Sequence, residues 1–260
     1  MEADKQNSSL DMLGIKPIGE AFNTTVHKSL QGIEGFLKIV CVPVLEELGL
    51  YLRDNVRYWR LNNILRILEK AQGKLEYENQ ELNIKAHPRV ALEIIEKGSL
   101  NDNDEVQEMW AGLFASSCTK DDQGDENLIF VDLLKQLTIA EARILKYSSE
   151  CARKIIYENG LIIGDYLKIE CKALMEISGI NEIHRLDREL DHLRSLNLIG
   201  LGLSGGFDLE DKYLFADITP TSLALNLYVR SQGYNIDPAL YWKDNLITVA
   251  DKQKEEMENF

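Results

Sequence analysis

The stretch HPRVALEIIEKGSLNDNDEVQEMWAGLFASS, residues 87–117, predicts two consecutive helices. Pro88 fits the first position of one helix, and Gly98 is a natural stop at its C-terminal end. In the next helix the apolar side chains follow the steps i, i+3, i+4, i+7 and i+8, at Val106, Met109, Trp110, Leu113 and Phe114. This spacing gives a helix one apolar face, so we expect Trp110 to be a core residue.

Four acidic residues lie at the junction of the two helices, at Asp102, Asp104, Glu105 and Glu108. Asp102 stands three positions before Glu105, which is the spacing of a helix-capping pair. Acidic side chains also interact favourably with the dipole at a helix N-terminus. A calcium-binding loop needs alternating oxygen ligands, a glycine at its sixth position and a glutamate at its twelfth. Neither Asn101 nor Asp102 begins such a frame, so we interpret the run as a capped helix and not as a metal site.

The whole sequence is typical of a mainly α-helical globular protein. It has 260 residues, of which 45% are hydrophobic and 28% are charged, and it contains 5 prolines. We predict a flexible lead-in over 1–20, a helical domain over 21–117, an acidic linker over 118–127, a second domain over 128–235, and a C-terminal helix and tail over 236–260.

The second domain shows an order of elements that is typical of a winged helix-turn-helix fold. A capping box at Thr138 and Glu141 predicts a helix that runs through Ile144 and Leu145, with Lys154 as its farthest limit. A short helix is expected at 173–180, a longer one at 181–199, two strands joined by a glycine-containing turn at 200–219, and a last helix at 219–233. The predicted fold class is therefore mainly α, with an N-terminal helical domain and a C-terminal winged-helix-like domain that carries a small β-hairpin.

Two groups of arginines are the candidate partner-binding residues. The first follows one helix face and the second lies in the predicted helix 181–199; the candidates are Arg53, Arg57, Arg60, Arg185, Arg188 and Arg194. Either group could bind an anionic partner. The alternative for the first group is a solvated face that pairs with acidic neighbours such as Glu46 and Asp54.

The charge of the chain disfavours DNA as the partner without excluding it. The formal net charge is −14 and is spread along the sequence. In the predicted recognition helix the arginines are opposed by acidic residues, and the predicted wing is acidic as well, at Glu182, Asp187, Glu189, Asp191, Asp208, Glu210 and Asp211. Affinity for DNA depends on cations that contact phosphates, so we expect a protein partner. Formation of a homo-oligomer by this chain is left open as a further possibility.

The most apolar run, 36–45, is too short to span a bilayer, and membrane binding is not expected.

No pattern of residues predicts catalysis, a cofactor or a metal. The four cysteines, Cys41, Cys118, Cys151 and Cys171, form no close pairs, and we interpret them as reduced thiols of a cytoplasmic protein. The sequence has no P-loop, no G-x-G-x-x-G and no G-x-S-x-G motif. His184 and His192 lie eight positions apart, but two ligands alone do not make a metal site. We therefore predict a protein that is not an enzyme.

Several stretches resemble a known family. They are Pro88, Val90, Ile94, Ile95, Ser99 and Leu100, then 102–111, together with EELGLYLRDNVRYW at 46–59 and LLKQLTIAEARIL at 133–145. These residues resemble the abortive-infection alpha (Abi-alpha) family of bacterial proteins, over about residues 40–230. The resemblance implies a role in phage defence and carries over no catalytic residue. The expected function is binding of another macromolecule, a protein, in phage defence. The alternatives are a winged-helix DNA-binding regulator and a membrane-acting toxic effector that uses residues 30–52.

Overall fold

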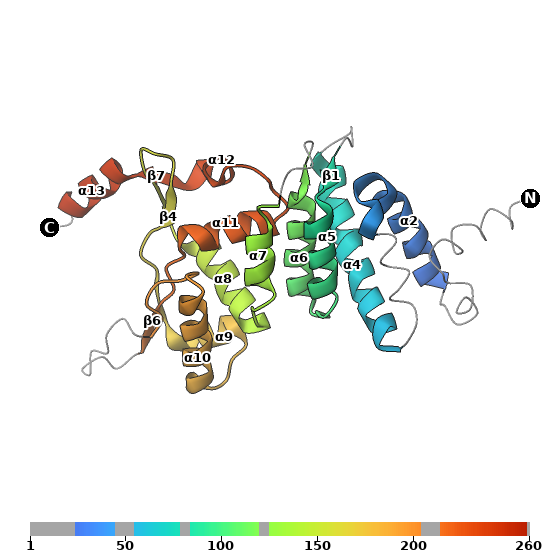
Figure 1. Cartoon of the computed structure of the whole chain (residues 1–260). Coiled ribbons are helices and arrows are strands. Elements are labelled where there is room, and N and C mark those ends of the chain that lie inside the picture. The colour runs from blue at the N-terminus through green and yellow to red at the C-terminus, as the bar shows by residue number, and fades with distance from the viewer. Residues whose placement is uncertain (1–23, 45–54, 79–83, 120–124, 204–213, 259–260) are drawn as a thin grey trace, which may run out of the picture. The chain divides into compact units, whose positions relative to one another are not determined.

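A computed structural model describes residues 24–44, 55–78, 84–119, 125–203 and 214–258 (Figure 1). The chain forms two compact units. The first unit contains Met1–Lys135 and Arg230–Asn235, and the second contains Gln136–Val229 and Ile236–Phe260. The units thus divide after Lys135, whereas the sequence placed a linker at 118–127 and assigned 128–135 to the second domain. The expected lead-in, 1–20, lies outside the described residues. Most of the described chain is helical.

The first unit is built on helices α4 (Asn55–Glu78), α5 (Pro88–Gly98) and α6 (Asp104–Ser116), which lie side by side in Figure 1. Helices α2 (Thr24–Val40) and α7 (Leu128–Leu134) pack against them, and β1 (Lys85–Ala86) pairs with β2 (Cys118–Thr119). The expected core position of Trp110 is confirmed, because its side chain is 0% exposed. The ring centroids of Phe36 and Phe114 are 6.2 Å apart, which joins α2 to the same core.

The N-terminus of α6 is capped one residue later than the sequence predicted. Asn103 is the N-cap, and its side-chain oxygen accepts a hydrogen bond of 3.1 Å from the backbone N–H of Val106. Asp102 is exposed and precedes the helix, so the predicted Asp102–Glu105 capping pair was wrong. The physical reason is that Asn and Asp are equally good N-caps, and the two candidates are adjacent.

Gly112 permits a close approach of two backbones within the first unit. A Cβ atom built at this position would lie 1.7 Å from the carbonyl oxygen of Ser231. Ser231 belongs to the short return segment, Arg230–Asn235, that packs with the first unit. Glycine is therefore required here for packing and not for an unusual backbone angle.

The second unit contains α8 (Ile139–Cys151), α9 (Cys171–Ser178) and α10 (Ile183–Ser195), which pack on one another. Strand β5 (Lys168–Glu170) pairs antiparallel with β6 (Phe215–Asp217). Isolated bridges join Ile199 to Pro220 and Gly202 to Asp217, so the chain after α10 runs along β6. Most of the predicted hairpin turn lies in 204–213, outside the described residues. The apolar face of α10 is buried, at Leu186, Leu190 and Leu193.

A second small sheet has the order β4–β3–β7, with β3 (Lys154–Ile156) in the middle. Strand β4 (Ile162–Gly164) is antiparallel to β3, and β7 (Leu246–Thr248) is parallel to it. Helix α11 (Ser222–Ser231) accounts for the last helix predicted in the second domain.

The C-terminal segment, predicted from the sequence as a helix and tail over 236–260, contains more than one helix. It consists of α12 (Pro238–Tyr241), a 3₁₀ turn at Lys243–Asn245, strand β7 and helix α13 (Val249–Glu258). The prediction was wrong because the pairing of β7 with β3 joins residues that are far apart in sequence. Local periodicity contains no information about such a pairing.

Within the described part of the chain, no helix combines the length and the apolar character needed to cross a bilayer.

Candidate functional site

The exposed side of α10 carries the three arginines that the sequence singled out in this unit. Arg185, Arg188 and Arg194 are all exposed. They do not form one compact stripe, because residues 185 and 194 differ by nine positions and so point roughly 180° apart around the helix. Arg185 Nε lies 3.3 Å from Glu189 Oε1, and Arg194 Nη2 lies 2.8 Å from Asp191 Oδ1. The surface of α10 is therefore one of mixed charge.

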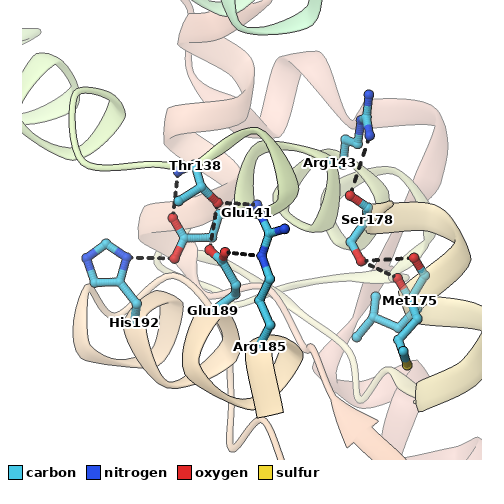
Figure 2. Close-up of polar contacts among 9 residues, drawn as sticks. Thr138, Glu141, Arg143, Met175, Ser178, Arg185, Glu189 and His192 are labelled. Carbon is cyan, nitrogen blue, oxygen red and sulfur yellow. Dashed lines mark hydrogen bonds and ion pairs between the residues drawn. The ribbon is translucent and has the colours of Figure 1, made fainter. Parts of the chain in front are cut away.

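A polar cluster with two buried carboxylates joins α10 to the start of α8 (Figure 2). The capping box predicted at Thr138 is confirmed: its hydroxyl accepts from the backbone N–H of Glu141 at 3.2 Å, and Glu141 Oε2 accepts from the N–H of Thr138 at 2.8 Å. The hydroxyl of Thr138 in turn donates to Glu189 Oε2 at 2.6 Å. Through its backbone N–H and its hydroxyl, Thr138 thus hydrogen-bonds to two buried carboxylates, one from α8 and one from α10.

His192 connects this cluster to the surface. Its Nδ1 is 2.6 Å from Glu141 Oε1, and its side chain is 39% exposed, whereas that of Glu141 is 0% exposed. Burial, opposed by the hydrogen bonds of Thr138 and His192, raises the pKa of Glu141. Figure 2 shows the second ring nitrogen of His192 on the side away from Glu141. A histidine held in this way presents one nitrogen to a partner while a carboxylate fixes the orientation of the ring.

A second polar contact fixes α9 against α8 and offers no nucleophile. Arg143 Nη1 donates to the carbonyl oxygen of Ser178 at 3.4 Å. The hydroxyl of Ser178 donates to the carbonyl oxygens of Leu174 and Met175, at 2.8 and 3.2 Å, within its own helix (Figure 2). These bonds stabilise the end of α9, so we assign Ser178 and Arg143 a structural role.

The first arginine group has one member that the structure describes fully. Arg53 and the side chain of Arg57 lie outside the described residues. Arg60 Nε donates to Ser99 Oγ at 2.8 Å, and its Nη2 donates to the carbonyl oxygen of Glu96 at 3.0 Å. Arg60 thus stabilises the C-terminal end of α5, where a cation is favourable.

The acidic run before and within α6 is engaged by lysines of α4. Lys70 Nζ forms an ion pair with Glu108 and lies 3.0 Å from Asp104 Oδ1. Lys74 Nζ lies 3.4 Å from Glu108 Oε2. These acids therefore join two helices of the first unit. In the residues that the structure describes, no group of three or more His, Cys, Asp or Glu side chains is placed to hold a metal.

A buried lysine in β3 was missed by sequence reasoning. Lys154 is 1% exposed, and its Nζ lies 4.0 Å from the ring centroid of Trp242 and 3.3 Å from the carbonyl oxygen of Glu150. Burial lowers the pKa of Lys154 to about 8. Trp242 also stacks on Tyr228, whose hydroxyl donates to Glu150 Oε1 at 2.8 Å. One weak signal for it exists in the sequence, where a lysine is followed by two isoleucines at 154–156.

Comparison with known proteins now identifies the family. The sequence profile described as "Abortive infection alpha" matches residues 60–236, which is more than half of the chain. The chain belongs to this family. The resemblance seen at 88–111 and at 133–145 is thereby confirmed. No curated protein and no solved structure matches the chain. Membership of the abortive infection alpha family suggests an abortive-infection-type role, and it brings no catalytic residue with it.

Proposed function

We propose that this protein acts in phage defence of the abortive-infection type, without catalysis, by binding another protein. The observation that carries the proposal is the family match over residues 60–236. Nearly all of that match lies in α4 to α11, so it covers helices of both compact units. Residue chemistry adds support, because Thr138, Glu141 and Arg143 are engaged in packing helices together.

We also infer that the second unit has a winged-helix topology. Helix α8 is followed by β3 and β4 and then by β5, α9, α10, extended chain and β6; apart from β3 and β4, this is the order of helix, strand, helix, helix and a strand pair in that fold. The pairing of β5 with β6, and the bridge from Gly202 to Asp217, supports a three-stranded arrangement. In this topology α10 is the helix that faces a partner.

The charges on α10 favour protein over DNA as that partner. Between Ile183 and Ser195 three arginines stand against Asp187, Glu189 and Asp191. Two of the arginines are already paired within the helix. A surface that carries both signs of charge fits a complementary protein surface, whereas a phosphate backbone needs an excess of cations.

The membrane-acting alternative has less support. In α2 and the residues after it, the described part of 30–52 buries its apolar side chains in the first unit, at Ile33, Phe36, Leu37, Val40, Cys41 and Val44. Ile39 and Val42 are exposed. Residues 45–52 lie outside the described part. A helix that inserts into a membrane would have to withdraw this apolar face from the core.

The test combines phage plating with a surface variant. Cells that express the wild-type protein should plate phage less efficiently at low dose, and their cultures should collapse at high dose. Arg188→Glu reverses a charge in the middle of the exposed side of α10 and should abolish protection. Lys146→Glu makes the same charge change on an exposed position of α8 and should leave protection intact. Full protection by Arg188→Glu would contradict a role for α10, and no protection by the wild type against a broad phage panel would contradict the defence role.

A further inference from the structure

The outward side of α10 carries a row of three nitrogen-bearing side chains, at His184, Arg188 and His192. They are spaced four residues apart, so they follow one another along the helix at intervals of about 6 Å and turn by about 40° at each step. His184 and Arg188 are exposed, and the side chain of His192 is 39% exposed. The leucines of α10 are buried on the other side of the helix. These three residues are called the basic row.

Two members of the basic row have no internal partner. In the part of the chain that the structure describes, no group pairs with the side chain of His184 or Arg188. The other two arginines of α10 differ, since each already has a carboxylate partner within the helix. The positive charge that α10 has left for a partner is therefore concentrated in the basic row.

The third member, His192, is oriented by the carboxylate behind it. Its Nδ1 lies 2.6 Å from Glu141 Oε1, and Figure 2 shows the second ring nitrogen on the side away from Glu141. With a proton on each nitrogen, the ring bonds to Glu141 through Nδ1 and offers its Nε2–H outward. A second carboxylate at Nε2 would place the imidazolium between two opposite charges, which favours the charged ring. The site is thus suited to bind a carboxylate together with a proton.

The charges beside the basic row favour an acidic protein segment over DNA. Asp187 is half-buried at the edge of the same surface, and among the described residues it too has no partner. A protein segment can place a cation against Asp187 while its carboxylates face the row, whereas a phosphate backbone brings only negative charge. The interval of about 6 Å also matches the distance between side chains four residues apart on a second helix.

We propose that the basic row is the docking site for an acidic helix of the partner protein, one that carries carboxylates at four-residue intervals along one face. Arg188 binds the central carboxylate, and the imidazolium rings of His184 and His192 bind the flanking ones through charge-assisted hydrogen bonds. Glu141 positions the ring of His192 for this contact. The inference rests on the proposed function, because it takes α10 as the helix that faces the partner, and it adds the chemical class of that partner.

The experiment uses two alanine-rich helical peptides of the same composition, each with three glutamates. In the matched peptide the glutamates stand at four-residue intervals, and in the control peptide they are spread around the helix. Binding is followed at millimolar peptide by NMR of the histidine ring protons, at about pH 6, where exposed imidazoles carry a proton. The chain has only 4 histidines, and the variants His184→Gln and His192→Gln assign the two signals of the row.

The matched peptide should shift the signals of His184 and His192 and leave those of the other two histidines in place. It should bind at least about five-fold more tightly than the control peptide, because an exposed ion pair contributes up to about that factor. Arg188→Gln should weaken binding of the matched peptide by a similar factor. Lys146→Gln removes the charge of an exposed lysine on α8 and should bind like the wild type. Circular dichroism checks that each variant is folded.

Three results would overturn the proposal. They are no shift of either signal at millimolar matched peptide, equal affinity for the two peptides, and equal binding by wild type and Arg188→Gln. If duplex DNA shifts the same two signals and the matched peptide does not, the row binds phosphate instead. Phage plating decides the defence role separately. Protection that is lost with Arg188→Glu, without binding of the matched peptide, would keep α10 as the partner-facing helix and exclude an acidic helix as its partner.

Discussion

At the residue scale, Trp110 joins the sequence pattern most directly to stability. Its indole is fully buried among the helices of the first unit. Trp110→Ala should lower the free energy of unfolding by about 3–5 kcal/mol, because the substitution removes a large buried side chain and leaves a cavity. Urea denaturation followed by circular dichroism measures the change. Trp59→Ala is the control, since Trp59 is 40% exposed and should cost much less. Equal losses for the two variants would contradict the placement of Trp110 in the core.

Lys154 leads to a prediction about pH. Because burial lowers its pKa from 10.5 to about 8, the unfolded chain binds more protons than the folded chain between these values. The contribution of Lys154 to stability therefore rises with pH from about 8 to about 10.5 and is lost as the pH falls through this window. Lys154→Met keeps a long side chain and removes the charge. The difference in unfolding free energy, variant minus wild type, should be most positive below pH 8 and should shrink toward pH 10.5.

The comparison of variant with wild type is needed because other groups titrate in the same range. Burial raises the pKa of Cys171 to about 11 and raises the pKa of Tyr228 further, and both groups oppose the slope due to Lys154. A difference that does not vary with pH would show that Lys154 is as hydrated in the folded chain as in the unfolded chain.

For Glu141, the dependence of stability on pH has the opposite sign to that for Lys154. Its pKa is raised, chiefly by burial, so the folded chain keeps its proton to higher pH than the unfolded chain does. Stability that depends on this group falls as pH rises above 4.5 toward the folded pKa. Glu141→Gln removes the charge and keeps an oxygen that accepts from Thr138. The unfolding free energy of the variant relative to wild type should therefore increase between pH 4.5 and pH 7, as measured by urea denaturation. A relative stability that decreases over this range would show that the pair with His192 outweighs burial.

At the element scale, Gly112 and Gly73 form a matched pair of helical glycines. A Cβ at Gly112 would clash with the carbonyl oxygen of Ser231, whereas a Cβ at Gly73 in α4 meets nothing within 4 Å. Gly112→Ala should destabilise the protein by about 1–3 kcal/mol or more, as overpacking does. Gly73→Ala should stabilise it by about 0.5–1 kcal/mol, because alanine favours the helix interior. Thermal unfolding of both variants checks the signs, and a stable Gly112→Ala protein would contradict the close approach.

Elements were predictable from sequence where their signals are local. The box at Thr138 and Glu141 places the start of α8, and the apolar periodicity at Val106–Phe114 places α6. The cap of α6 was missed by one residue, because Asp102 and Asn103 are equivalent signals. Strand β7 could not be predicted, since its partner β3 lies about ninety residues earlier in the sequence. The contacts of the buried Glu141 and Glu189 with Thr138 and His192 depend likewise on how α8 and α10 pack.

At the scale of the whole molecule, the net charge favours a protein over DNA as the binding partner. The element order of the second unit allows contact with DNA, but the chain has a net charge of −14. DNA affinity arises largely from counterions that cations of the protein release, and non-specific binding by basic proteins has Kd values of about 10⁻⁴–10⁻⁶ M at physiological salt. We therefore expect no binding of this protein to duplex DNA at up to about 100 μM protein and about 150 mM salt, a range in which such binding would be detected.

Fluorescence anisotropy with a labelled duplex makes the measurement, and its salt dependence decides the interpretation. If the protein binds and its affinity falls steeply between low and high salt, phosphate contacts must overcome the acidity of the chain, and α10 becomes the DNA-facing helix. Arg188→Glu should then reduce both the affinity and the salt slope, because a phosphate contact is lost. If there is no binding even at low salt, the mixed charges of α10 are not a focused phosphate-binding surface. Arg185 and Arg194 then act mainly through their ion pairs with Glu189 and Asp191, which leaves Arg188 as the arginine of α10 to probe with protein partners.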